Sequence, residues 1–272
     1  MSTSKSLNPQ KENLKKNNKW SFWIDRGGTF TDILAKDPNG DLHPLKLLSE
    51  NPESYEDAAI EGIRQSLNLK PSDPIPAHMI DTVKMGTTVA TNALLEHKGE
   101  PTLLLTSAGL SDVLEIGTQA RADIFALNII KPQMLYSKTC AIEERINADG
   151  TIIIPLNIEK TKKVLQEHYD NGLRSVAILF MHSYKYPNHE KETAKLAKDI
   201  GYTQISTSHK TSPLIKSIPR GDTTVIDAYL SPILHHYTSQ IAQKLNTNSS
   251  NTNSSNTNTS KIDLTFMTSS GG

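Results

Sequence analysis

The stretch Asp25-Arg26-Gly27-Gly28-Thr29-Phe30-Thr31-Asp32 decides the fold, because it joins two segments with the residue pattern of β-strands. Strands are expected over Ser21–Ile24 and Thr29–Lys36, with a tight turn over Asp25–Gly28 between them. Paired glycines let the backbone turn sharply and approach a bulky anion closely. The sequence therefore predicts a β-hairpin whose tip is a candidate anion site.

This hairpin tip has the chemistry of a phosphate site. Backbone N–H groups and threonine hydroxyls can surround phosphate oxygens, and the candidate ligands are Gly27, Gly28, Thr29 and Thr31. A carboxylate at a strand end can hold a hydrated Mg²⁺ ion or orient a water molecule. Asp25 is therefore the candidate metal residue, and Asp25 and Asp32 are the candidate catalytic residues. The alternative is a plain glycine hairpin with a solvated aspartate, but the two threonines and two carboxylates favour phosphate binding.

Two common nucleotide motifs are excluded. A Walker A loop would continue with Gly-Lys-Ser/Thr, and no such sequence follows here. A Rossmann fingerprint leads from glycines into a helix, whereas a strand is expected after these glycines. The turn signal Asp37-Pro38-Asn39-Gly40 and a strand over Leu42–Leu48 come next, so three antiparallel strands open the fold.

A second candidate site follows the strand expected over Ile80–Met85. A helix is expected over Thr87–His97, and a strand that ends at a helix start presents free N–H groups and hydroxyls to an anion. An ordinary threonine N-cap explains these residues equally well. Arg121 has the geometry to clamp a carboxylate with two hydrogen bonds, although a surface salt bridge is the commoner role of a single arginine. The candidate substrate-binding residues are Gly86, Thr87, Thr88, Asn92 and Arg121.

The remainder of the chain predicts a layered α/β fold, because strands and helices alternate after the opening antiparallel strands. A first helix is expected around residues 55–67. Later strands are expected over Thr102–Thr106, Cys140–Ile146, Thr151–Ile154, Ser175–Phe180, Thr203–Ser206 and Lys261–Met267. Later helices are expected over Leu110–Ile116, Ile158–Tyr169, Asn188–Ile200 and Arg220–Leu245, the last bent at Pro232.

Composition excludes several classes of partner. The 272 residues include 29 acidic and 29 basic side chains, without basic and aromatic interleaving, so we expect no nucleic-acid partner. No apolar stretch approaches the length of a membrane span, and residues 1–19 lack the apolar core of a secretory signal. A cytoplasmic protein without a membrane partner is expected. Cys140, the single cysteine, is expected to be a buried structural thiol rather than a nucleophile.

Four blocks of sequence resemble the N-terminal region of the hydantoinase A/5-oxoprolinase family, closest to its eukaryotic, ATP-hydrolysing 5-oxoprolinase branch. They are Ile24–Asp32, Lys46–Glu50, Met85–Glu100 and Ile116–Arg121, and the long third block is the most specific. The hairpin also resembles the first phosphate loop of the actin, hexokinase and Hsp70 ATPase superfamily. The resemblance therefore implies an α/β fold of the actin-like (ribonuclease H-like) ATPase lobe.

The resemblance and the composition together imply four segments. A disordered tail is expected over residues 1–19 and the hydantoinase/oxoprolinase N-terminal domain over residues 20–245. Residues 246–260 contain only Asn, Thr and Ser and are expected to form a low-complexity linker. Residues 261–272 are expected to start a hydantoinase A domain, so that the second lobe is truncated. Ser270 stands there in place of the acidic residue that this family pattern leads us to expect.

The implied reaction is ATP-dependent hydrolysis of 5-oxo-L-proline to L-glutamate, in the γ-glutamyl cycle of glutathione metabolism. ATP and Mg²⁺ are the implied cofactors, with K⁺ as a further candidate. The implied partners are 5-oxo-L-proline and either a second copy of the chain or further hydantoinase domains. The alternatives are a non-catalytic, truncated paralogue and a hydantoinase-type hydrolase of another cyclic amide.

Overall fold

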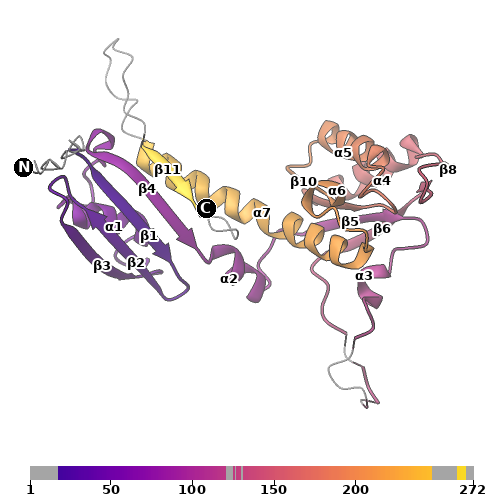
Figure 1. Cartoon of the computed structure of the whole chain (residues 1–272), viewed down its shortest axis with the longest axis horizontal. Coiled ribbons are helices and arrows are strands. Elements are labelled where there is room, and N and C mark those ends of the chain that lie inside the picture. The colour runs from indigo at the N-terminus through magenta and orange to yellow at the C-terminus, as the bar shows by residue number, and fades with distance from the viewer. Residues whose placement is uncertain (1–17, 121–124, 126, 130, 247–261, 268–272) are drawn as a thin grey trace, which may run out of the picture. The chain divides into compact units, whose positions relative to one another are not determined.

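The computed structural model describes residues 18–120, 125, 127–129, 131–246 and 262–267. Contacts divide the chain into two compact units (Figure 1). Of the described residues, unit 1 holds those up to Thr88 and those from Ser239 onward, and unit 2 holds those from Val89 to Thr238. The domain predicted over residues 20–245 thus contains parts of both units. Arg121 and Ser270 lie outside the described residues, and so do residues 1–17 of the tail predicted over 1–19 and residues 247–260 of the linker predicted over 246–260.

Unit 1 is built on a five-stranded sheet in the order β11-β4-β1-β2-β3 (Figure 1). The strands are β1 (Trp20–Arg26), β2 (Phe30–Lys36), β3 (Leu42–Leu48), β4 (Ile80–Thr87) and β11 (Asp263–Phe266). β1, β2 and β3 are antiparallel, whereas β4 runs parallel to β1 and β11 runs parallel to β4. The three opening antiparallel strands that the sequence predicted are confirmed, and β3 has the expected bounds.

β1 extends further than the strand expected over Ser21–Ile24. Asp25 pairs with Asp32 and Arg26 with Thr31, so the turn consists of residues 27–29 rather than 25–28. Because Asp25 and Asp32 are register partners in the β1–β2 ladder, the backbone stays extended up to Gly27. Because side chains alternate along a strand, Asp25 and Asp32 lie on the exposed face of the sheet, and Thr31 lies on the buried face.

Helix α1 (Ala58–Ser66) packs on the buried face of this sheet against β1, β2 and β3 (Figure 1). Asp57 caps the helix, because its carboxylate accepts the N–H groups of Ala59 and Ile60. The sequence predicted that this helix begins at about residue 55, but it begins at Ala58. Tyr55 instead forms a β-bridge with Asn51. A short 3₁₀ helix, η1 (Ala77–Met79), leads into β4.

Unit 2 is built on a parallel sheet in the order β10-β9-β5-β6. The strands are β5 (Thr102–Ser107), β6 (Lys138–Ile142), β9 (Ser175–Leu179) and β10 (Gln204–Thr207). β5 and β9 are buried at every position, as central strands of parallel sheets usually are. The predicted alternation of strands and helices is thereby confirmed.

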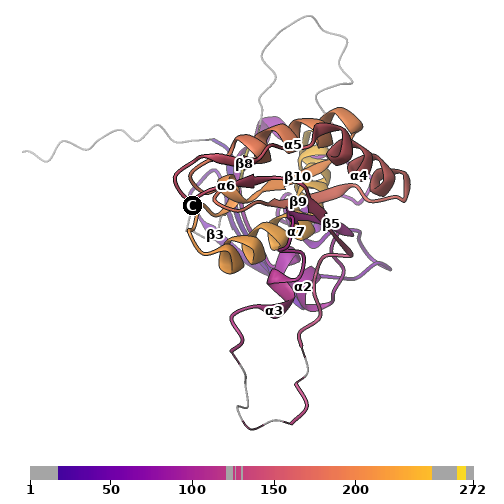
Figure 2. The same ribbon diagram turned by 90° about the vertical axis from the view of Figure 1, so that its right-hand side faces the viewer.

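Helices cover both faces of this parallel sheet. α4 (Ile158–Asp170) and α5 (Asn188–Ile200) lie side by side on one face (Figure 2), where Leu103 and Leu105 pack with Leu165 and Ala197. The neighbouring Leu104 points to the opposite face and packs with Ala228 of α7 (Ser217–Asn246). The alternation along β5 therefore divides the core of unit 2 into two layers.

The strand expected over Cys140–Ile146 is wrong. β6 ends at Ile142, and β7 (Arg145–Ile146) pairs with β8 (Ile152–Ile154) in a separate two-stranded antiparallel sheet. The chain leaves the parallel sheet because Glu144, between the two strands, is fully buried and binds side chains of other elements. The predicted turn at Asp149-Gly150 joins β7 to β8.

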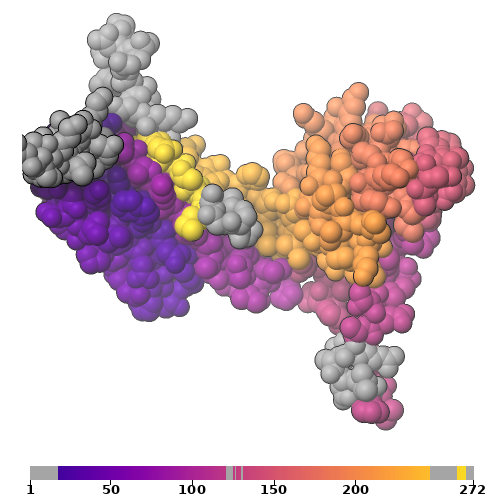
Figure 3. Space-filling model, viewed as in Figure 1, coloured from indigo at the N-terminus to yellow at the C-terminus, as the bar shows by residue number. Residues whose placement is uncertain are grey.

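The remaining helices are short except for α7. They are α2 (Val89–Leu95), α3 (Val113–Ile116) and α6 (Ser208–Thr211), and α6 was not predicted. α7 starts three residues before the expected Arg220 and contains Pro232. No helix within the described residues combines the length and the apolar character of a membrane span. β11 is exposed at the surface of unit 1 (Figure 3).

Candidate functional site

The turn between β1 and β2 is closed by a short backbone hydrogen bond. The Gly27 N–H donates to the Phe30 carbonyl at 3.0 Å. A Cβ atom at position 27 would lie only 2.9 Å from that carbonyl oxygen, closer than real Cβ atoms approach. Gly27 is therefore required by the tightness of the turn, as the sequence led us to expect.

Two amides at the tip of this turn face solvent. Gly28 and Thr29 are both exposed, and neither N–H group has a hydrogen-bond acceptor among the residues that the structure describes. Consecutive exposed N–H groups in a turn form a concave donor surface that suits an anion. The turn therefore has the donor set that phosphate oxygens require.

A row of four residues crosses the exposed face of the sheet next to this turn. Register places Gly86 of β4, Asp25 of β1, Asp32 of β2 and Lys46 of β3 side by side. Lys46 Nζ lies 2.8 Å from Asp32 Oδ1 and neutralises that carboxylate. Asp25 has no ion-pair partner among the described side chains, and its Oδ1 would lie 3.2 Å from a Cβ atom at position 86. A glycine at position 86 thus leaves room for the Asp25 carboxylate.

The end of β4 is joined to the same turn. The Thr88 N–H and hydroxyl both donate to the Arg26 carbonyl, at 3.0 and 3.2 Å. These bonds extend the strand to Thr87, so helix α2 starts at Val89 and not at the expected Thr87. The structure therefore brings together these predicted residues: Asp25, Gly27, Gly28, Thr29, Asp32, Gly86, Thr87 and Thr88. Asn92 lies on α2 in unit 2.

Thr31 lies on the opposite side of the sheet from the two aspartates. Its side chain is fully buried, and its Oγ1 lies 3.0 Å from Oγ of Ser49. Ser49 in turn donates its hydroxyl to the Gly27 carbonyl at 2.7 Å. Thr31 therefore contacts the turn from beneath. Sequence reasoning missed Ser49, because one serine after a strand carries no periodic signal.

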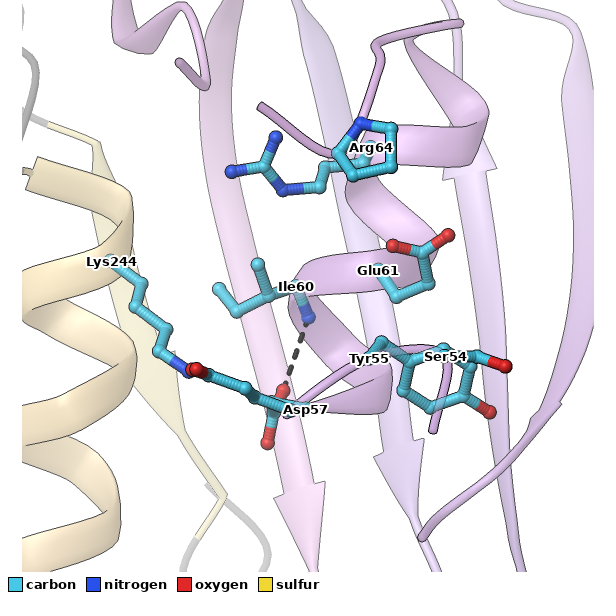
Figure 4. A pocket seen from close by; sticks show the side chains of 9 residues that line it. Ser54, Tyr55, Asp57, Ile60, Glu61, Arg64 and Lys244 are labelled. Carbon is cyan, nitrogen blue, oxygen red and sulfur yellow. Dashed lines mark hydrogen bonds and ion pairs between the residues drawn. The ribbon is translucent and has the colours of Figure 1, made fainter. Parts of the chain in front are cut away.

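Unit 1 also has a polar cavity of about 360 Å³ beside the start of α1 (Figure 4). Every charged side chain in its wall already has a partner. Glu56 pairs with Lys244 at 2.7 Å, and Glu61 accepts from Gln65 at 2.8 Å. Arg64 donates to backbone carbonyls, and Asp57 caps α1. The cavity therefore offers no unpaired charge to a ligand, and the turn is the better candidate site.

Unit 2 contains a buried polar network that the sequence did not predict. Glu144 accepts the Ser107 hydroxyl and lies 2.7 Å from His189 Nδ1. Glu190 accepts the Phe180 amide at 3.0 Å and the Ser208 hydroxyl at 2.7 Å, and it lies 2.6 Å from His209 Nδ1. Arg220 of α7 donates to Ser208 Oγ and to the Phe180 carbonyl. This network ties the ends of β9 and β10 to α7.

Cys140 is half-buried and lies 3.0 Å from Nε2 of His168. Burial raises the pKa of the Cys140 thiol, and the nearby Glu167 carboxylate raises it further. A raised pKa opposes thiolate formation and favours a structural role. Among the described residues, no three His, Cys, Asp or Glu side chains form a group that could hold a metal ion.

Comparison with known proteins identifies relatives of this chain. Residues 21–201 match the model of the hydantoinase/oxoprolinase N-terminal region. 5-Oxoprolinase 1 of Arabidopsis thaliana is 39% identical over 280 residues, which cover 93% of this chain and 21% of the relative. 5-Oxoprolinase of Dictyostelium discoideum is 39% identical over 292 residues, which cover 96% of this chain and 22% of the relative. The chain thus spans about a fifth of the length of these curated relatives.

A solved structure shows the same fold. The ATP-dependent caprolactamase from Pseudomonas jessenii aligns with a TM-score of 0.68 and 28% identity, over 83% of this chain and 33% of that chain. The fold class predicted from the sequence, an α/β fold consistent with an actin-like ATPase lobe, is confirmed.

Proposed function

Because this chain belongs to the hydantoinase/oxoprolinase family, to whose N-terminal region it corresponds, we propose that it is the phosphate-binding part of an ATP-dependent hydrolase of a cyclic amide. We propose 5-oxo-L-proline as the substrate and L-glutamate as the product, since two relatives of 39% identity are 5-oxoprolinases. The chain spans about a fifth of their length, so the complete reaction belongs to a longer protein or to an assembly with further hydantoinase domains.

One observation carries this proposal: the exposed amides of Gly28 and Thr29 lie next to the Asp25 carboxylate, and within the described part of the chain none of these groups has a hydrogen-bond acceptor or ion-pair partner. We assign the Gly28 and Thr29 amides to the phosphates of ATP. Gly27, whose own N–H closes the turn, lets the backbone approach the phosphates closely, and Thr31 supports the turn from beneath. Asp25 is exposed beside Gly86 and fits a hydrated Mg²⁺ ion, which prefers carboxylate and water oxygens. Asp32 with its partner Lys46 lies next to Asp25 and contributes to the charge balance of the site.

The chemistry explains why such a site is needed. A lactam is a stable amide with a poorly electrophilic carbonyl carbon. Transfer of the γ-phosphoryl group of ATP to the carbonyl oxygen releases ADP and activates that carbon toward water. Water then adds to that carbon, the ring C–N bond breaks as the nitrogen takes up a proton, and a second water molecule hydrolyses the resulting acyl phosphate to give glutamate and phosphate. The protein contributes mainly position and charge, because phosphoryl transfer needs in-line geometry.

The substrate side of the site is assigned to the residues around the end of β4. Gly86, Thr87 and Thr88 adjoin the turn within unit 1. We extend the proposal to Asn92 and Arg121, whose amide and guanidinium groups suit the carboxylate of 5-oxo-L-proline. Mg²⁺ supplies charge neutralisation of the phosphates when bound.

Calorimetric titration tests the proposal. The 272-residue chain is titrated with ATP·Mg²⁺ and with AMP, and the Gly28→Val variant is titrated in parallel. We expect the wild-type chain to bind ATP·Mg²⁺ more tightly than AMP, and Gly28→Val to lose that preference. Equal affinity of both proteins for ATP·Mg²⁺ would remove the phosphate assignment of the turn.

A further inference from the structure

We infer that Ser49 is a positioning residue of the phosphate site, which fixes the direction of the Gly28 amide from behind. This inference rests on the proposed function, because it gives that amide a phosphate-bearing ligand. Ser49 directly follows β3 and is only 3% exposed. It therefore reaches the turn from the protein interior and cannot itself contact a ligand on the exposed side.

Ser49 contacts three alternate residues, of which Gly27 and Thr29 belong to the turn and Thr31 belongs to β2. Its hydroxyl donates to the Gly27 carbonyl at 2.7 Å, and its N–H donates to the Thr29 carbonyl at 2.9 Å. Its Oγ also lies 3.0 Å from Thr31 Oγ1. Because the single Ser49 proton is already given to Gly27, Thr31 is the donor in this hydroxyl pair. The two buried hydroxyls thus form a chain that ends on a carbonyl of the turn.

Through the geometry of the peptide bond, the contact of Ser49 with the Gly27 carbonyl also sets the direction of the Gly28 N–H on the exposed side. In a trans peptide the C=O of one residue and the N–H of the next point in opposite directions, and no described peptide bond is cis. Ser49 binds the Gly27 carbonyl, so the Gly28 N–H must point away from Ser49. That N–H is exposed and without an acceptor among the described residues. A donor fixed in this way needs little reorganisation when an anion binds.

Another hydroxyl of unit 1 provides a matched control. Ser66 Oγ donates to the Gly62 carbonyl at 2.8 Å inside α1, so it makes the same type of bond as Ser49. A purely structural serine would affect stability in the way that Ser66 does. A positioning serine would in addition change the order of the Gly28 amide and the affinity for polyphosphate.

The experiment compares the wild-type 272-residue chain with its Ser49→Ala, Ser49→Thr and Ser66→Ala variants, all labelled with ¹⁵N. The measurements are the heteronuclear NOE of the Gly28 amide, the thermal midpoint, and the dissociation constants of ATP·Mg²⁺ and tripolyphosphate·Mg²⁺. Ser49→Ala should make the Gly28 amide mobile. It should also lower the affinity for both probes about tenfold, which corresponds to ~1.4 kcal/mol of binding free energy. Ser49→Thr keeps the hydroxyl and should keep most of the amide order, and Ser66→Ala should change neither property.

The outcomes separate this inference from the function on which it rests. An ordered Gly28 amide or unchanged polyphosphate affinity in Ser49→Ala overturns the positioning role and leaves the phosphate site standing. Failure of the wild-type chain to bind either probe overturns the proposed function and the ligand role together. If Ser49→Ala does not fold, Ser49→Cys replaces the hydroxyl by a thiol, which is a weak donor to the Gly27 carbonyl, and must loosen the Gly28 amide. An unchanged Gly28 amide in that variant overturns the inference.

Discussion

Asp25 and Gly86 are register partners on parallel strands, and a methyl group at position 86 would lie 3.2 Å from Asp25 Oδ1. This contact is tight enough to move the carboxylate by a few tenths of an ångström. The absence of a side chain at position 86 therefore helps to set the position of Asp25.

Replacing Gly86 by alanine should weaken ATP·Mg²⁺ binding about fivefold, the effect of ~1 kcal/mol. The thermal midpoint should change little, because Asp25 is exposed and free to shift toward solvent. Lys84→Ala is the matched control, since Lys84 lies on the same face of β4 and is exposed. Calorimetric titration of both variants checks the prediction, and equal losses in both would contradict it.

The two aspartates should differ in their dependence on Mg²⁺. Asp25→Asn removes a carboxylate that has no ion-pair partner among the described residues, so it should abolish the gain in ATP affinity that Mg²⁺ provides. Asp32→Asn should have a smaller effect, because Lys46 already neutralises Asp32. Titration with ATP in the presence and in the absence of Mg²⁺ measures both effects. A larger loss in Asp32→Asn would reverse the assigned roles.

The 272-residue chain alone should not release glutamate from 5-oxo-L-proline at an appreciable rate. It spans 21–22% of the 5-oxoprolinases that it matches, and in-line phosphoryl transfer depends on groups that enclose the nucleotide from several sides. Loss of that geometry costs several orders of magnitude in rate. A coupled assay for ADP and glutamate tests this. Robust release that disappears in Asp25→Ala would show that the chain is a complete enzyme.

Alkylation of Cys140 should be slow near neutral pH. Burial raises the pKa of its thiol, and a folded-state pKa above the unfolded value keeps the proton on the native protein. The contribution of Cys140 to stability is therefore fully present below the unfolded pKa of about 8.5 and is lost as pH rises above it. Unfolding free energies between pH 7.5 and 10 should fall less steeply in Cys140→Ala. An identical slope would contradict the raised pKa.

The Glu190 network should be a large source of stability in unit 2. Glu190→Gln puts a donor amide against groups that already donate, and disrupting such a buried charge costs about 3 kcal/mol. Glu143→Gln is the matched control, because Glu143 is exposed and pairs with the exposed Lys160. It should leave the thermal midpoint almost unchanged. Similar midpoints for the two variants would show that the buried network contributes little.

The sequence predicts best where a local signal decides the structure. The Asp37-Pro38-Asn39-Gly40 turn places β3 correctly, because Asp37 Oδ1 accepts the N–H groups of Asn39, Gly40 and Asp41 within that segment. The α5 bounds are also correct, since its apolar spacing and the left-handed Gly201 both lie within the segment. In these elements nothing distant changes the outcome.

The sequence predicts less well where distant groups decide. Glu144 ends a strand that its neighbours would have continued, because its partners Ser107 and His189 lie far away in the chain. Ser49 likewise acquires its role only from contacts with the turn. The candidate site follows the same division. The sequence alone identifies the glycines and aspartates at the hairpin. Only the folded structure reveals that Ser49 and Thr31 support the turn, and that the Gly28 N–H has no acceptor among the described residues.

β11 completes the sheet of unit 1 from far along the chain. The Thr82 hydroxyl donates to the Asp263 carbonyl at 3.2 Å, across a separation of 181 residues. On the ribosome, β4 therefore emerges with one open edge and keeps it until residues 263–266 are made, a delay of roughly ten to thirty seconds at ordinary rates of synthesis. All of unit 2 is translated in that interval. Open strand edges invite pairing with other chains, so the pace of translation through codons 88–266 sets how long the nascent protein is vulnerable to aggregation.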